Sequence, residues 1–133
     1  MQARTRGTRI RAAILGLALA TTGCVAAAAA GAAGAVYATT RGVESLVNGS
    51  PDAIATRARS VFQQMGIAED AASTEDSGAK RELKGKKGDL DVTVQMEQQD
   101  SATTKVEVYA RKNLAEWDKD YAREVLQAIV KKT

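Results

Sequence analysis

The residue best suited to chemistry is Cys24, the only cysteine in the chain. An apolar run at residues 12–20 precedes it, and the small residues Thr21, Thr22 and Gly23 lead directly into it. Upstream of that run lie four arginines, Arg4, Arg6, Arg9 and Arg11. A charged segment, a short apolar segment and small residues before a cut are the three parts of an export signal. We therefore expect residues 1–23 to be a lipoprotein signal peptide and Cys24 to carry lipid.

Two other outcomes stay open for this N-terminal segment. Leucine is preferred three positions before a lipidated cysteine, whereas this chain has Thr21. Residues 12–38 are long enough to span a bilayer as a helix, so an uncleaved anchor is one alternative. The other alternative is cleavage by the ordinary signal peptidase after a small-residue pattern such as residues 18–20.

The rest of the chain offers little for catalysis or metal binding. It has no histidine, which removes the usual base at neutral pH and the commonest metal ligand. With Cys24 used for lipid, no cysteine nucleophile and no cysteine–histidine zinc site remain. Ser77 and Lys80 have the spacing of a serine–lysine hydrolase motif, but the companion motifs are missing. We expect a protein that is not an enzyme and uses no metal or cofactor; the alternative is a small envelope enzyme acting on cell-wall or lipid material.

Lysines and aromatic residues in the second half of the chain form a candidate surface for a partner or a membrane. A basic run holds Lys80, Arg81, Lys84, Lys86 and Lys87, while Trp117 is grouped with Tyr109 and Tyr121. Cations near an anionic surface contribute about 1 kcal/mol each. We assign the candidate surface to Lys84, Lys86, Lys87 and Trp117. The alternatives are that the lysines protect a sheet edge from aggregation and that the aromatic rings pack at the rim of the core.

Charge and length limit the kind of protein. The chain has 19 Lys+Arg and 16 Asp+Glu, a net charge of +3. Removal of the four arginines before Cys24 changes the balance to 15 − 16 = −1. A nearly neutral domain without a visible stacking platform argues against nucleic-acid binding. The sequence divides into the signal peptide, an Ala/Gly-rich tether at 24–35, and one domain at 36–133.

Two helices are expected. Ser50 is a suitable N-cap, Pro51 fits the first helical position, and Gly66 suits the C-terminal end. The apolar residues between them recur at helical spacing, namely Ile54, Ala58, Val61, Phe62 and Met65. A second amphipathic pattern predicts a helix over residues 117–131.

Strands are expected in the remaining segments. Residues 36–40 and 43–47 are β-prone, 67–74 and 79–84 are weaker candidates, and 85–88 is expected to be a turn. Residues 90–97 and 104–110 alternate apolar and polar side chains, the pattern of a sheet with one buried face. We expect an α+β fold: a single two-layer domain whose antiparallel sheet of about four to five strands carries both helices on one face.

The chain resembles a family of small, uncharacterised lipoproteins of Gram-negative bacteria. The resemblance rests on Gly23 and Cys24, the Ala/Gly-rich run that follows, Tyr37 followed by Gly42, and the order of the elements. It implies a lipid-anchored protein with a compact α+β domain and an unassigned activity. We expect a membrane-anchored periplasmic protein that is a binding or structural component of the cell envelope, with an envelope protein as candidate partner. Val25 after the lipidated cysteine implies sorting to the outer membrane, facing the periplasm.

Overall fold

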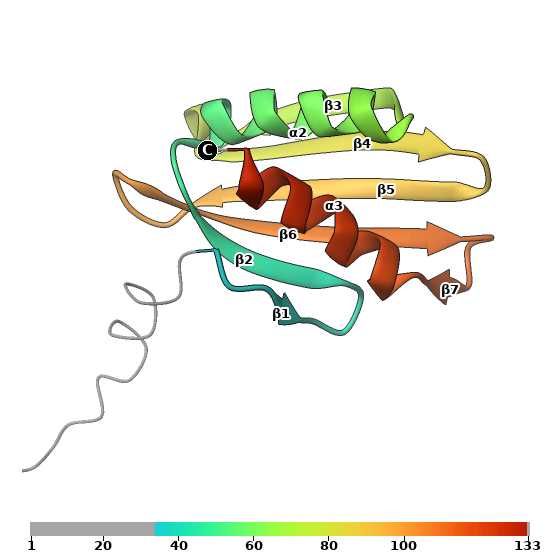
Figure 1. Cartoon of the computed structure of the whole chain (residues 1–133). Helices are drawn as coiled ribbons and strands as arrows, with labels where there is room; N and C mark the ends of the chain where they lie inside the picture. Colours follow the sequence, from blue (N-terminus) through green and yellow to red (C-terminus); the bar gives the residue numbers. More distant parts are fainter. Residues whose placement is uncertain (1–33, 133) are drawn as a thin grey trace, which may run out of the picture.

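The computed structural model describes residues 34–132, which form a seven-stranded antiparallel sheet with two helices packed on one face (Figure 1). Cys24, the predicted signal peptide and the tether up to residue 33 lie outside the described residues. In chain order the elements are β1 Tyr37–Ala38, β2 Val43–Asn48, α2 Pro51–Met65, β3 Ala68–Glu75, a 3-10 turn η1 Asp76–Gly78, β4 Lys80–Lys87, β5 Leu90–Gln98, β6 Thr103–Lys112, β7 Glu116–Trp117 and α3 Lys119–Lys131.

The sheet is built by one crossover followed by a meander. The strand order is β1-β2-β6-β5-β4-β3, with β7 added beside β6. Helix α2 carries the chain from β2 to the opposite edge at β3, and β4, β5 and β6 then return step by step until β6 pairs with β2. Both helices cover the same face of the sheet, α2 over β3–β5 and α3 over β2 and β6 (Figure 1). No helix within residues 34–132 is long and apolar enough to cross a membrane.

The expected antiparallel α+β fold is confirmed, but the sheet has seven strands and the prediction of four to five was too low. The short strands β1 and β7 have two residues each. Strand β3 is exposed at every position, so burial imposes no alternation of apolar and polar residues on it. Residues 67–74 were only a weak strand candidate and Trp117 was assigned to a helix, so the expected number of strands was too low.

Helix α2 confirms the expected capping. The Ser50 Oγ accepts a hydrogen bond from the Ala53 N–H at 3.2 Å, and Pro51 opens the helix. Gly66 ends it in the left-handed conformation at φ 69°, a conformation that glycine adopts without steric cost. Every large apolar residue of the predicted stripe is buried apart from Met65, which is half-buried.

Helix α3 begins two residues later than expected. Trp117 was predicted to start the helix but belongs to β7, where it pairs with Arg111. The cap is Asp118, whose Oδ1 accepts from the Tyr121 N–H at 2.9 Å. The charged, helix-favouring residues around Trp117 concealed this short strand.

The expected turn at residues 85–88 was wrong, because β4 continues through Lys87 and the chain reverses at Gly88 and Asp89. Gly85 is a glycine for a packing reason and marks no turn. A Cβ at this position would lie 2.7 Å from Phe62 Cε2 and 2.6 Å from Ile67 Cγ2. Helix α2 therefore sits directly on the backbone of β4.

The core lies between the helices and the covered face of the sheet. Val94 and Val108 pair across β5 and β6 with no exposed surface, and Phe62 of α2 is 1% exposed. The first described residues also join this unit: the Gly34 N–H donates to the Leu46 carbonyl at 2.7 Å, and Val36 packs against the core. Gly34 and Val36 thus already belong to the packed domain.

Candidate functional site

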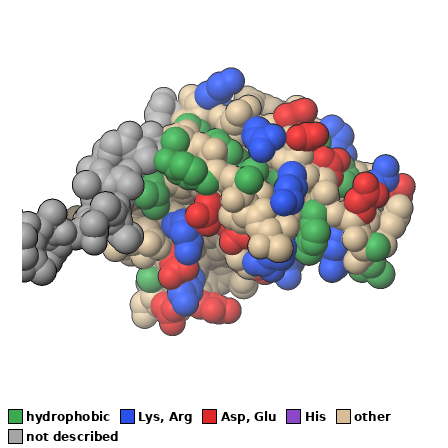
Figure 2. Space-filling model, turned by 90° about the horizontal axis from the view of Figure 1, so that it is seen from below, with side chains coloured by type: hydrophobic (Ala, Val, Ile, Leu, Met, Phe, Trp, Pro, Cys, Tyr) green, Lys and Arg blue, Asp and Glu red, His purple; other side chains and the backbone are tan. Residues whose placement is uncertain are grey.

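The face of the sheet away from the helices is polar and carries the candidate site. We call it the open face; its central side chains come from alternate positions of four strands, namely Glu44 and Leu46 on β2, Lys80, Glu82, Lys84 and Lys86 on β4, Asp91, Thr93, Gln95 and Glu97 on β5, and Lys105, Glu107, Tyr109 and Arg111 on β6. Opposite charges alternate across the strands in two rows, Lys80–Glu97–Lys105 and Lys86–Asp91–Arg111. Figure 2 shows the same mixing of acidic and basic side chains on the side of the molecule toward β1.

A groove of about 320 Å³ lies on the part of the open face next to β7. We call it the aromatic groove, and its side chains come from the β1–β2 connection and from the five strands β3 to β7: Arg41, Asp70, Lys84, Asp91, Thr93, Tyr109, Arg111 and Trp117. Thr93 is 7% exposed and lies between Lys84 and Tyr109 in the register of the sheet. It therefore forms part of the floor.

Two aromatic rings and two guanidinium groups form one wall of the aromatic groove. The rings of Tyr109 and Trp117 meet edge to face, with centroids 5.6 Å apart and planes at 85°. The Arg41 guanidinium lies 4.6 Å from the Tyr109 ring centroid, and that of Arg111 lies 5.7 Å from the Trp117 centroid. A cation over a ring face is attracted by about 0.5–1 kcal/mol at exposed sites. The rings thus hold two flexible cationic side chains in place.

The backbone positions Arg41 through the glycine that follows it. A Cβ at Gly42 would collide with the Val108 carbonyl oxygen and lie 2.9 Å from Tyr109 Cα. Only a glycine lets the chain pass this close to β6. Thr39 closes the turn, because its Oγ1 accepts from the Gly42 N–H at 3.0 Å.

Trp117 is positioned by a tight reversal after β6. Asn113 and Leu114 both have left-handed backbone conformations, with φ 51° and 67°, and the next residues return antiparallel to β6. The Asp118 N–H donates to the Ala110 carbonyl at 2.9 Å and fixes the end of this return. Leu114 at the tip is 76% exposed.

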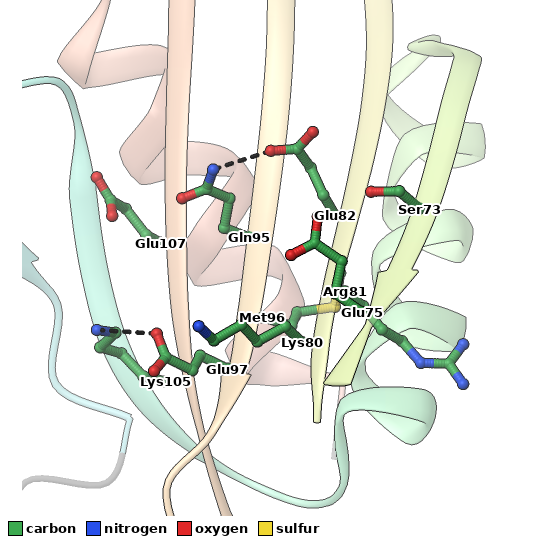
Figure 3. A pocket seen from close by; sticks show the side chains of 10 residues that line it. All are labelled: Ser73, Glu75, Lys80, Arg81, Glu82, Gln95, Met96, Glu97, Lys105 and Glu107. Carbon is green, nitrogen blue, oxygen red and sulfur yellow. Dashed lines mark hydrogen bonds and ion pairs between the residues drawn. The ribbon is translucent and has the colours of Figure 1, made fainter. Parts of the chain in front are cut away.

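A second hollow of about 280 Å³, the charged groove, lies further along the open face (Figure 3). In Figure 3 Gln95 points toward Glu82, and Lys105 points toward Glu97. The Gln95 amide donates to Glu82 at 2.8 Å, and Lys105 Nζ lies 3.6 Å from the Glu97 carboxylate. Arg81 turns away from these groups and pairs with Asp52 of α2 at 3.1 Å. The acidic groups of this groove are therefore mostly matched by neighbours.

Glu82 interacts with one residue of each groove, Gln95 of the charged groove and Lys84 of the aromatic groove. The hydrogen bond from Gln95 lowers the pKa of its carboxyl, against the effect of burial, and Lys84 lowers it further. The same contact with Glu82, 3.0 Å from Lys84 Nζ, raises the pKa of that lysine. Glu82 and Lys84 are thus both charged at neutral pH.

The structure separates the four residues predicted as one surface. Lys84 and Trp117 line the aromatic groove. Lys86 lies on the same face, opposite Asp91 in the register. Lys87 belongs to the other face, where its Nζ lies 5.5 Å from the ring centroid of Tyr121 on α3. Tyr121 is therefore separate from the Tyr109–Trp117 pair.

Sequence reasoning missed Arg41 and Arg111. Arg111 continues the alternation of Lys105, Glu107 and Tyr109 by two residues, so that pattern contained the signal for it. Arg41 reaches the groove through a turn, and no periodic pattern indicates where a turn residue points.

The structure also shows the surroundings of the weaker sequence motifs within residues 34–132. Within residues 34–132, no cluster of three or more Asp, Glu, Cys or His side chains is placed to hold a metal ion. Ser77 lies in the η1 turn with φ 56°, and Lys80 pairs with Asp76 at 3.6 Å. The serine–lysine spacing therefore occurs on a turn and a strand rather than at a helix start.

The chain matches no family model, no curated protein and no solved structure.

Proposed function

We propose that this protein is a membrane-anchored, non-enzymatic binding component of the cell envelope. Lipid on Cys24 holds it to the outer membrane on the periplasmic side, and the open face binds a ligand or partner. One observation carries the binding role: both helices cover one face of the sheet, while the other face carries the aromatic groove. Concave sites with a few convergent polar groups and aromatic walls are typical of binding sites.

The anchor is supported by the sequence around Cys24 and is tested by metabolic labelling. Cells grown with an alkyne-bearing fatty acid should label the wild-type protein and leave Cys24→Ser unlabelled. The protein should also remain in the membrane fraction, because the several acyl chains of a lipoprotein anchor it stably whereas a single chain binds weakly. Equal labelling of both proteins would exclude lipid attachment at Cys24.

The binding role is tested by photocrosslinking in intact cells. A photoreactive amino acid replaces Lys84 at the aromatic groove or, as a matched control, the exposed Lys131 at the end of α3. We expect a defined adduct from position 84, absent from position 131 and lost when Arg111→Gln is added. The same adducts from both positions would show that the open face has no special binding role.

A further inference from the structure

The charges of the aromatic groove have both signs. Arg41, Lys84 and Arg111 are its cations, and Asp70 and Asp91 are its carboxylates. A site for a bare anion gains nothing from two carboxylates in its lining. A ligand rich in hydroxyl groups can interact with both the cations and the carboxylates. The carboxylates accept hydrogen bonds from its hydroxyls, while arginine and lysine donate to its oxygens and to an anionic group.

The three cations are not equivalent. Arg41 lies 3.6 Å from the Glu107 carboxylate, and Lys84 lies 3.0 Å from Glu82. Arg111 has no ion pair among residues 34–132 and is held over Trp117. Its planar fork of donors matches a carboxylate with two parallel hydrogen bonds. Arg111 is therefore the group available for an anionic substituent of the ligand.

We propose that the aromatic groove binds a carboxylate-bearing sugar unit of an anionic glycan, an inference that rests on the proposed binding function. Arg111 pairs with the sugar carboxylate, Asp70 and Asp91 accept from its hydroxyls, and Trp117 packs against its apolar C–H groups. The hollow of about 320 Å³ lies at the small end of ligand pockets, roughly 300–1,000 Å³. A short stretch of sugar fits this space.

Trp117 supplies a direct reporter, because it is the only tryptophan in the chain and lines the groove. The full chain, purified in detergent micelles, is titrated with a hyaluronan tetrasaccharide, which carries a carboxylate on alternate sugars. Chitotetraose serves as the neutral glycan, and inorganic phosphate serves as the anion without sugar. We expect the acidic tetrasaccharide alone to shift the emission of Trp117 and to protect it from acrylamide quenching.

Two matched variants locate the binding. Arg111→Gln removes the free cation and should weaken the acidic tetrasaccharide about tenfold or more, as loss of a charge-assisted pair predicts. Lys105→Gln removes the same charge on the same face but from the charged groove, and it should leave the affinity within about twofold. Far-UV circular dichroism confirms that both variants are folded.

Each other outcome overturns the glycan proposal. Equal binding of chitotetraose removes the role of the carboxylate, and competition by inorganic phosphate alone shows a simple anion site. No response to any probe, together with a protein adduct from position 84 in cells, rejects the glycan and leaves the binding function standing. No response and no adduct reject both.

Discussion

The two faces of the sheet are built from neighbouring residues of the same strands and are held by different forces. Val94 on β5 has no exposed surface and lies on the covered face, whereas Gln95 beside it is half-buried and hydrogen-bonded on the open face. Burial of apolar area stabilises by about 25 cal/mol per Å², while exposed ion pairs contribute about 0–1 kcal/mol each. The covered face therefore maintains the fold, and the open face contributes much less to stability.

The largest expected loss of stability comes from a substitution in the core on the covered face. Phe62→Ala removes a ring that is 1% exposed, and the loss of burial together with the cavity should cost about 3–5 kcal/mol. Urea unfolding followed by circular dichroism measures the difference. Thr56→Ala, at an exposed position of the same helix, is the control and should change stability by less than about 0.5 kcal/mol. Similar losses in both variants would contradict a core between α2 and the sheet.

Gly85→Ala tests the close packing of α2 on β4 with the addition of one methyl group. The new Cβ would lie 2.6 Å from Ile67 Cγ2 and 2.9 Å from the Ala68 carbonyl oxygen, so we expect a loss of about 1–3 kcal/mol from overpacking. Lys86→Ala, one residue later on the open face, should be close to neutral. Equal unfolding midpoints for the two variants would show that the helix does not press on the strand.

On the open face, Gln95→Ala should have a smaller effect. It removes the hydrogen bonds that the amide donates to Glu82 at 2.8 Å and to the Tyr109 hydroxyl at 3.3 Å. A loss of about 0.5–1.5 kcal/mol follows from typical net values, again measured by urea unfolding. A loss as large as that of Phe62→Ala would mean that the open face also carries the fold.

The smallest effect is a pH dependence. The Gln95 hydrogen bond lowers the pKa of Glu82 in the folded state. The ionised Glu82 carboxylate therefore stabilises the folded protein fully above the ordinary glutamate pKa, and this stabilisation is lost as the pH falls through the lowered pKa. The stability difference between wild type and Glu82→Gln should therefore shrink from about pH 6 to about pH 3. With 26% of the side chain exposed, the difference stays below about 1 kcal/mol. A difference that grows toward low pH would reverse the assigned sign.

Much of the covered face could be predicted from sequence. Burial of one face imposes period two on β5 and β6 and helical spacing on α2, and the caps at Ser50 and Gly66 mark the ends of that helix. These signals are local and follow directly from the core. The second helix was predicted equally well apart from its first turn.

The open face was harder to predict because its organisation comes from contacts between distant segments. Nothing in the local sequence indicates that Arg41 reaches Tyr109, which lies on β6 in a distant part of the chain. The lysines at 84, 86 and 87 look equivalent in the sequence, yet strand parity sends Lys87 to Tyr121 on the opposite side. Side chains alternate between the two faces along a strand, so a strand that continues through Lys87 determines the face on which each lysine lies. Because a turn was predicted at residues 85–88, this alternation could not be applied to Lys86 and Lys87.

The docking of the first described residues has a mechanical consequence. Gly34 is bonded to Leu46, and β1 then runs antiparallel along β2 toward the end of the sheet that holds the aromatic groove. If the N-terminal side of the chain is held while a ligand is pulled at the groove, the tension acts along the strands rather than across them. The hydrogen bonds between β1, β2 and β6 would then share the force in shear.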